Sequence, residues 1–159
     1  MFAKPQAEHQ WLDKLLGEWV CEGECDMGPD QPKMKHQAQV SGRTLGGLWF
    51  VLEMTMPGPE GGDAIVNYMN LGYDPEQKKY VGSFFGSCMA NHWIYAGTVD
   101  ASGKKLTLDT RGPKFDGSGQ TDYQDMIEWT ADNEWTLSSQ YKLDDGSWKH
   151  FMTATHKRP

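Results

Sequence analysis

The sequence is poor in cysteine, and the number and spacing of its cysteines argue against a disulfide framework. It has three cysteines, Cys21, Cys25 and Cys88, which cannot all pair within one chain. If residues 19–27 form a strand, Cys21 and Cys25 lie about 13 Å apart at about 3.3 Å per residue, beyond the reach of a disulfide. We therefore expect free thiols, which are typical of a reducing compartment, and a cytoplasmic protein.

Clustered basic residues and long apolar runs are also lacking. The net charge is −7, and the basic clusters are no larger than the pairs Lys78–Lys79, Lys104–Lys105 and Lys157–Arg158. Nucleic-acid binders carry a basic face, so we expect no nucleic-acid partner. The apolar runs are far shorter than the roughly 20 residues of a membrane-spanning helix, and the first residues lack the apolar core of a secretory signal. We expect no membrane partner.

Sequence motifs for catalysis and cofactor binding are missing. The chain has no G-x-G-x-x-G, no G-x-x-x-x-G-K-[ST], no G-x-S-x-G, no H-E-x-x-H and no C-x-x-C. Glu22 and Glu24 share a face, but it is the polar face of their strand, which argues against an acid/base pair. We expect no catalytic residue and no cofactor.

Aromatic residues and glycine are, in contrast, plentiful. Seven Trp and 18 Gly occur among 159 residues, and the glycines recur between short apolar stretches, as in a protein with many turns. A chain of this length buries roughly 68–70% of its unfolded surface, enough for one core without disulfides or metal. We expect one domain over residues 1–159.

One segment has helical periodicity. Trp11, Leu12, Leu15 and Leu16 recur on one stripe, Pro5 precedes them and Gly17 follows. This pattern predicts a short N-terminal helix over residues 6–16. Such a helix can plug one end of a barrel.

From Trp19 onward the apolar period changes to two, which is typical of strands with one wet face. Turn residues such as Asp74-Pro75 and Asp144-Asp-Gly146 separate the runs. No helical pattern intervenes, so the strands are antiparallel. We expect an all-β, up-and-down closed barrel over residues 18–157 in preference to a sandwich, because closure removes sheet edges. The ten expected strands are 19–27, 34–45, 48–56, 64–73, 79–86, 90–100, 105–110, 121–130, 134–143 and 147–157.

Histidine and aromatic side chains supply candidate ligand-binding positions. His36 alternates with Ala38 and Val40, and His92 alternates with Ile94, so inward-facing strands would place imidazoles in the barrel. Hydrogen-bonded core or rim histidines are the simpler alternative. The face of residues 90–100 stays open, because Trp93 and Tyr95 occupy the other side. The candidate ligand-binding residues are His36, Tyr68, Phe84, His92, Trp148, His150 and His156.

The last strand gives a sharper expectation about metals. An even spacing places His150 and His156 on the same face of a regular strand, about 20 Å apart, so no single metal could bind both. A metal or haem site would need a histidine from another strand. We expect no metal.

The order of several motifs resembles a bacterial family known as domain of unknown function 1579, which belongs to the calycin-like barrels. The resemblance runs from about residue 7 to residue 158. It implies a lipocalin-like barrel and no established activity. The motifs that carry it are Leu15-Leu-Gly-Glu-Trp19, Ser41-Gly-Arg-Thr-Leu-Gly-Gly47, Leu71-Gly-Tyr-Asp-Pro-Glu-Gln-Lys-Lys-Tyr-Val81, Gly97-Thr-Val-Asp-Ala-Ser-Gly-Lys-Lys-Leu-Thr-Leu108 and Asp145-Gly-Ser-Trp148, with the terminal basic pair.

Three hypotheses of function remain open at this level. The first is non-catalytic binding of a small, largely apolar molecule inside a hollow barrel. The second is a packed barrel that acts in assembly, whose outer surface pairs with a second copy in a homodimer or with another partner through outward aromatics such as Trp49, Trp93 and Tyr95. The third is an enzyme that uses interior histidines as acid and base, and it has the least support.

Overall fold

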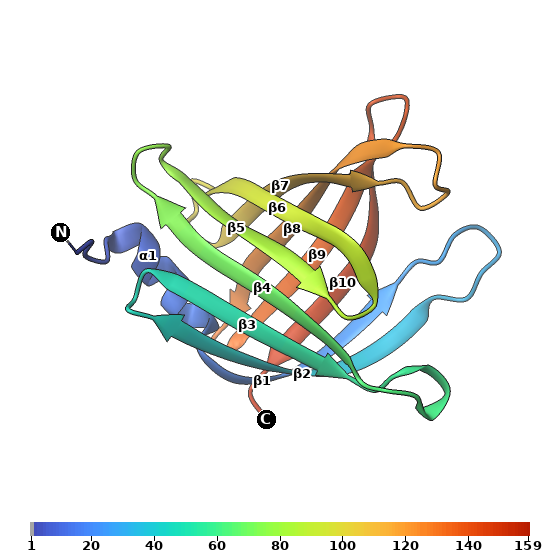
Figure 1. Ribbon diagram of the computed structural model, residues 1–159, viewed down its shortest axis with the longest axis horizontal. Helices are drawn as coiled ribbons and strands as arrows, with labels where there is room; N and C mark the ends of the chain where they lie inside the picture. The colour runs from blue at the N-terminus through green and yellow to red at the C-terminus, as the bar shows by residue number, and fades with distance from the viewer. Residues whose placement is uncertain (1) are drawn as a thin grey trace.

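Ten antiparallel strands close into a barrel in the computed structural model, which describes residues 2–159 (Figure 1). Each strand pairs with its neighbours in sequence, and β1 pairs with β10 from Val20 opposite Lys157 to Cys25 opposite Met152, which closes the sheet. The expected all-β up-and-down barrel is confirmed. The strands are β1 (Gly17–Cys25), β2 (Met34–Leu45), β3 (Trp49–Met56), β4 (Ile65–Asp74), β5 (Lys79–Gly86), β6 (Met89–Val99), β7 (Lys105–Pro113), β8 (Gln120–Ala131), β9 (Glu134–Lys142) and β10 (Trp148–Lys157).

A short N-terminal helical segment covers one end of the barrel (Figure 1). It consists of α1 (Ala7–Trp11) and the 3-10 helix η1 (Leu12–Leu15), within the expected 6–16. Trp11 Nε1 donates to the carbonyl of Gly103 at 2.7 Å, and the Tyr80 hydroxyl donates to the carbonyl of Glu8 at 2.8 Å. These bonds tie the helical segment to the β6–β7 turn and to the start of β5, as a plug requires.

The interior next to the helical segment is densely packed. Leu12 and Leu15 are fully buried against Trp19, Phe50 and the other apolar side chains of the core. Trp19 donates its indole N–H to the carbonyl of Leu15 at 3.0 Å and packs edge-on against Trp135. This half of the barrel is closed by side chains.

Residues at the two chain ends fasten the same half. The Arg158 guanidinium lies 3.6 Å from the ring centroid of Trp19 and donates to the carbonyls of Leu16 and Glu18. Gly17 has φ +95°, and a Cβ there would lie 2.7 Å from the Arg158 Nη1 atom. Glycine therefore serves both the backbone turn before β1 and the approach of the arginine.

The opposite end carries the connections between strands and no part of the N-terminal helical segment. The β1–β2, β3–β4, β5–β6, β7–β8 and β9–β10 connections lie there, and the β3–β4 connection contains the short 3-10 helix η2 (Pro59–Gly61). Within residues 2–159, no helix has the length and apolar character needed to cross a membrane.

Strand β10 contains a bulge. The residues before the bulge face the side of the sheet opposite to the one that regular alternation would give them. His150 lies opposite Gln140 and Met152 lies opposite Ser139, so Phe151 is an extra residue in the strand. A bulge of this kind shifts the alternation by one position. The expectation that His150 and His156 share a face is therefore wrong, because it assumed a regular strand.

Candidate functional site

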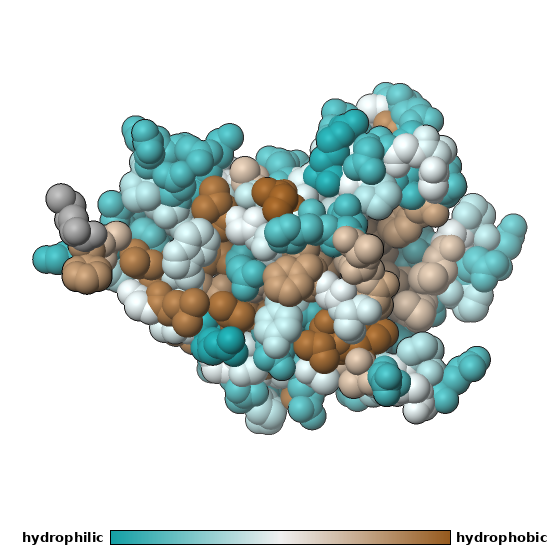
Figure 2. Space-filling view, in the orientation of Figure 1, coloured by the Kyte–Doolittle hydropathy of each residue, from teal (hydrophilic) through white to brown (hydrophobic). Residues whose placement is uncertain are grey.

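A cavity of about 440 Å³ opens at the end of the barrel away from the helical segment. Strands β4 to β10, β1 and the β7–β8 loop contribute to its wall. Figure 2 shows tan, apolar side chains between the teal loops at this end. The volume lies in the range of about 300–1,000 Å³ that is typical of small-molecule sites.

Five of the sixteen residues that line the cavity are aromatic: Phe84, Trp93, Phe115, Tyr123 and Phe151. Trp93 and Tyr123 meet edge to face with ring centroids 4.9 Å apart, and Phe115 meets Phe151 at 5.1 Å. Edge-to-face pairs are a favourable packing mode for aromatic rings. With Phe84, these rings form an apolar wall that can hold a planar or bulky ligand.

Two local features of the sequence bring these rings into the wall. The bulge in β10 turns Phe151 toward Tyr123 and Tyr141, whose ring centroids lie 6.2 and 5.6 Å away. Gly112 makes room for Trp93, since a Cβ at residue 112 would lie 2.1 Å from the indole ring.

Asp125 places a carboxyl group within this apolar wall. The side chain accepts a hydrogen bond from the Ser139 hydroxyl at 2.5 Å and another, short one from the Tyr95 hydroxyl. Burial raises the pKa of Asp125 above its usual value, and burial together with the nearby carboxylate raises the pKa of Tyr95 well above its own. Tyr95 therefore stays protonated and donates to Asp125.

Three further polar atoms at the cavity have no hydrogen-bond partner within residues 2–159. They are Asn67 Oδ1, Asn91 Nδ2 and Thr110 Oγ1, and all three residues line the cavity. Asn67 is only 7% exposed. A buried polar group without a partner costs about 1–3 kcal/mol, so these atoms call for a ligand or for water.

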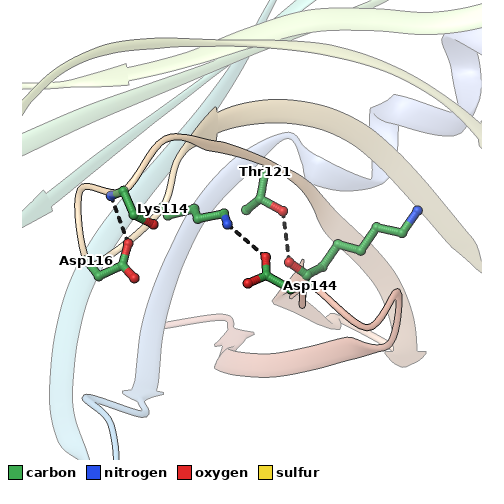
Figure 3. Close-up of polar contacts among 6 residues, drawn as sticks. Lys114, Asp116, Thr121 and Asp144 are labelled. Atoms are coloured by element: carbon green, nitrogen blue, oxygen red, sulfur yellow. Dashed lines mark hydrogen bonds and ion pairs between the residues drawn. The ribbon is translucent and has the colours of Figure 1, made fainter.

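The mouth of the cavity is bordered by two linked loops. Lys114 Nζ pairs with Asp144 at 2.8 Å, which joins the β7–β8 and β9–β10 loops, and the Thr121 hydroxyl donates to the carbonyl of Lys142 (Figure 3). Asp116 accepts the main-chain N–H of Ser118 within the first loop. The link positions the neighbouring Phe115, whose ring forms part of the wall.

Among the seven residues expected from the sequence, Phe84 alone lines this cavity. His36 faces the interior elsewhere and lies against Gly23, where a Cβ would approach the imidazole to 2.2 Å. His156 is fully buried in the packed half and stacks on Trp135 with ring centroids 3.6 Å apart. Burial lowers the pKa of His156 to about 4.

The other expected positions lie outside the barrel. Tyr68 hydrogen-bonds Glu53 and stacks on Phe85, which in turn meets His92 at 5.8 Å. His92 is exposed because Trp93 and Tyr95 take the inward face of β6, which answers the question that the sequence left open. The candidate residue His92 therefore does not line the barrel interior.

Trp148 and His150 precede the bulge and are exposed as well. His150 meets the Thr153 hydroxyl at 2.8 Å. The assembly hypothesis rested on three aromatic residues that were expected to face outward. Trp93 and Tyr95 face inward instead, and the third, Trp49, is 46% exposed.

The histidines are scattered across these separate places. Within the described residues, no group of three or more His, Cys, Asp or Glu side chains is arranged to hold a metal ion.

The residues that sequence reasoning missed are polar residues at strand positions where the alternating pattern otherwise has apolar residues. Asp125 alternates with Tyr123 and Ile127, and Asn67 precedes the fully buried Met69 by two residues. A polar residue at such a position must face the interior. The sequence carries this signal, because Asp125 and Asn67 stand where the alternation otherwise places apolar residues.

A second hollow, of about 480 Å³, lies over β1, β2 and β3 and the chain that follows them. Val20, Gln37, Gln39 and Thr55 contribute to its lining, which includes no aromatic ring and no charged side chain. It offers less specific recognition chemistry than the cavity at the barrel end.

The profile of one protein family matches residues 4–158. That family is described as a protein of unknown function, DUF1579. The chain belongs to this family. Membership of DUF1579 confirms the resemblance drawn from the sequence motifs. A comparison with curated protein sequences finds no match.

Solved structures share the barrel of this DUF1579 protein at low sequence identity. Rv2717c from M. tuberculosis has a TM-score of 0.65 and 15% identity, with 98% of this chain and 99% of Rv2717c covered. The S-type phycobiliprotein lyase CPES from Guillardia theta has a TM-score of 0.65 and 10% identity, with 97% and 93% covered. A redesigned β-barrel, mFAP0, bound to DFHBI, has a TM-score of 0.50 and 13% identity, with 91% and 99% covered. At these identities the likeness establishes the fold alone.

Proposed function

We propose that this DUF1579 protein binds a small, largely apolar molecule in the cavity at the loop end of its barrel. The observation that carries the proposal is the cavity itself, about 440 Å³ in volume, walled by aromatic rings and provided with a few converging polar groups. A mostly apolar pocket with a small number of polar groups is the usual form of a small-molecule site.

The difference in packing between the two ends of the barrel supports the proposed binding site. The half next to the helical segment is filled by Trp19, Trp135, Leu12 and Leu15, all at most 1% exposed. Among residues 2–159, unpartnered polar atoms occur in both halves, on Trp135 and His156 in the packed half and on Asn67, Asn91 and Thr110 at the cavity. A ligand in the cavity can satisfy the second set. The barrel mFAP0, which shares the fold, was solved bound to DFHBI.

The proposed site differs from the one expected from the sequence. It keeps Phe84 and adds Trp93, Tyr123, Asp125 and Phe151. We further propose that the protein works in a reducing compartment, because all three of its cysteines are free thiols.

The test uses N-phenyl-1-naphthylamine, an uncharged dye whose fluorescence rises in apolar surroundings. We expect saturable binding of one dye per chain. Cys25→Phe should weaken it at least about tenfold, because Cys25 lines the cavity and a phenyl ring takes up part of the volume.

Cys88→Phe is the matched control, since Cys88 is exposed and lies outside the cavity wall. It should bind the dye as the wild type does. Thermal unfolding of both variants verifies that each is folded. Equal dye affinity for the two variants, or the absence of saturable binding to the wild type, would contradict the proposal.

A further inference from the structure

If the cavity binds a small molecule, as proposed above, the polar groups of its wall indicate which class of ligand it takes. Asp125 brings an ionisable carboxyl group to the wall, and both of its hydrogen-bond donors are uncharged hydroxyls, from Tyr95 and Ser139. No basic side chain within residues 2–159 pairs with it. A carboxylate enclosed without a counter-charge is unfavourable, and a cation beside it relieves the penalty.

The single basic residue of the wall is turned toward another partner. Lys114 lines the cavity, but its Nζ atom pairs with Asp144 of the neighbouring loop, as Figure 3 shows. Asp144 is exposed on the β9–β10 loop, so the pair lies at the surface. The carboxyl group of Asp125 remains free to receive a cation from outside.

The other polar and aromatic groups of the cavity wall also suit a cationic ligand. A carboxylate has about four acceptor sites, and the two hydroxyls occupy only two of those on Asp125. Asn67 Oδ1 is a further acceptor without a partner. The faces of Trp93, Tyr123 and Phe151 carry the negative quadrupole that attracts organic cations.

We infer that the cavity selects small organic cations, namely amines attached to an aromatic or bicyclic body. The ammonium group pairs with Asp125, and the apolar body lies against Trp93 and Phe84. Asn91 Nδ2, an unpartnered donor, is left for one acceptor on the same ligand.

The test compares two compounds of the same shape by calorimetry, 1-naphthylmethylamine, which is cationic at pH 7, and 1-naphthalenemethanol, which is neutral. We expect the amine to bind the wild type about 30-fold more tightly, from a charge-assisted hydrogen bond and cation–π contact. In Asp125→Asn the difference should shrink to about threefold or less, through loss of affinity for the amine.

Asp122→Asn is the matched control. Asp122 lies on the same strand and pairs with Arg111 at the surface at 2.6 Å, so this substitution removes the same charge outside the cavity. It should keep the wild-type preference for the amine. Saturable dye binding, as proposed above, should persist in both variants.

Several results would overturn the inference. They are equal affinity of the two compounds for the wild type, failure of both to bind while the dye binds, and a preference for the amine that survives in Asp125→Asn. Each of these leaves the proposed binding function in place. If neither the dye nor the two compounds bind, the proposed function fails as well.

Discussion

Asp125 and Tyr95 form the most consequential contact at the scale of single residues. The carboxyl group is enclosed by the barrel, and its two donors lie on different strands, Tyr95 on β6 and Ser139 on β9. The arrangement holds a charged acceptor where burial disfavours charge, which is why the pKa of Asp125 is raised. On the proposed function, such a group serves binding and contributes little to the free energy of folding.

Stability measurements on two variants distinguish these contributions. Asp125→Asn should leave the free energy of unfolding at pH 7 unchanged or increase it, because it removes a buried charge. Tyr95→Phe should lower it by about 1–3 kcal/mol, because the carboxylate loses a donor while staying buried. Urea unfolding of the ligand-free protein measures both. A larger loss for Asp125→Asn than for Tyr95→Phe would show that the carboxylate stabilises the fold.

His156 makes stability depend on pH. Its pKa is about 4 in the folded protein against 6.5 when unperturbed, because the ring is fully buried on Trp135. Between these pH values the unfolded chain binds the proton and the folded chain does not, so stability falls as the pH drops through this window. The full loss is roughly 3 kcal/mol at about 1.4 kcal/mol per pKa unit.

Unfolding in urea at pH 8 and at pH 4.5 measures this dependence. His156→Phe keeps a flat ring against Trp135 and should flatten the profile, whereas His150→Gln, at an exposed position, should not change it. Asp125 acts in the opposite direction, since a raised carboxyl pKa favours the folded state at low pH. The comparison of each variant with the wild type cancels that contribution. An unchanged slope in His156→Phe would refute the assignment.

At the scale of elements, the strands could be predicted because alternation and turn residues agree along the chain. The Asp74-Pro75 and Asp144-Asp-Gly146 signals separate strands that the structure places within three residues of the expected ends. The bulge at Phe151 was not predicted, although Phe151 and Met152 are consecutive apolar residues that break the alternation. The extra residue is defined by the pairing of β10 with β9. That one extra residue decides which side of the sheet His150 faces.

The helical plug gives a prediction that separates folding from binding. Leu12 is fully buried, so Leu12→Ala should lower the free energy of unfolding by about 2–5 kcal/mol. The dye affinity should stay within about twofold, because Leu12 packs in the half of the barrel away from the cavity. Asp13→Ala, at an exposed position of the same segment, is the control and should change neither quantity. Loss of dye binding in folded Leu12→Ala would mean that the two halves are not independent.

At the scale of the whole molecule, the barrel is packed at one end and hollow at the other. Closure is the arrangement that the sequence favours, because it removes the exposed edges that an open sheet of ten strands would leave. A short N-terminal helix able to plug one end is also expected from the sequence. The place of the cavity does not follow from it. Whether Phe84 and Trp93 fill the interior or line a space depends on strand tilt and stagger, which set the width of a barrel.

The most direct test of this account is a crystal structure of the protein grown with N-phenyl-1-naphthylamine. We expect electron density for the dye inside the loop end of the barrel, within about 4 Å of Phe84, Trp93 and Phe151, which is ordinary apolar contact. The packed half around Trp19 should be unchanged. Density confined to the outer face, or a barrel whose loop end is filled by its own side chains, would contradict the central claim.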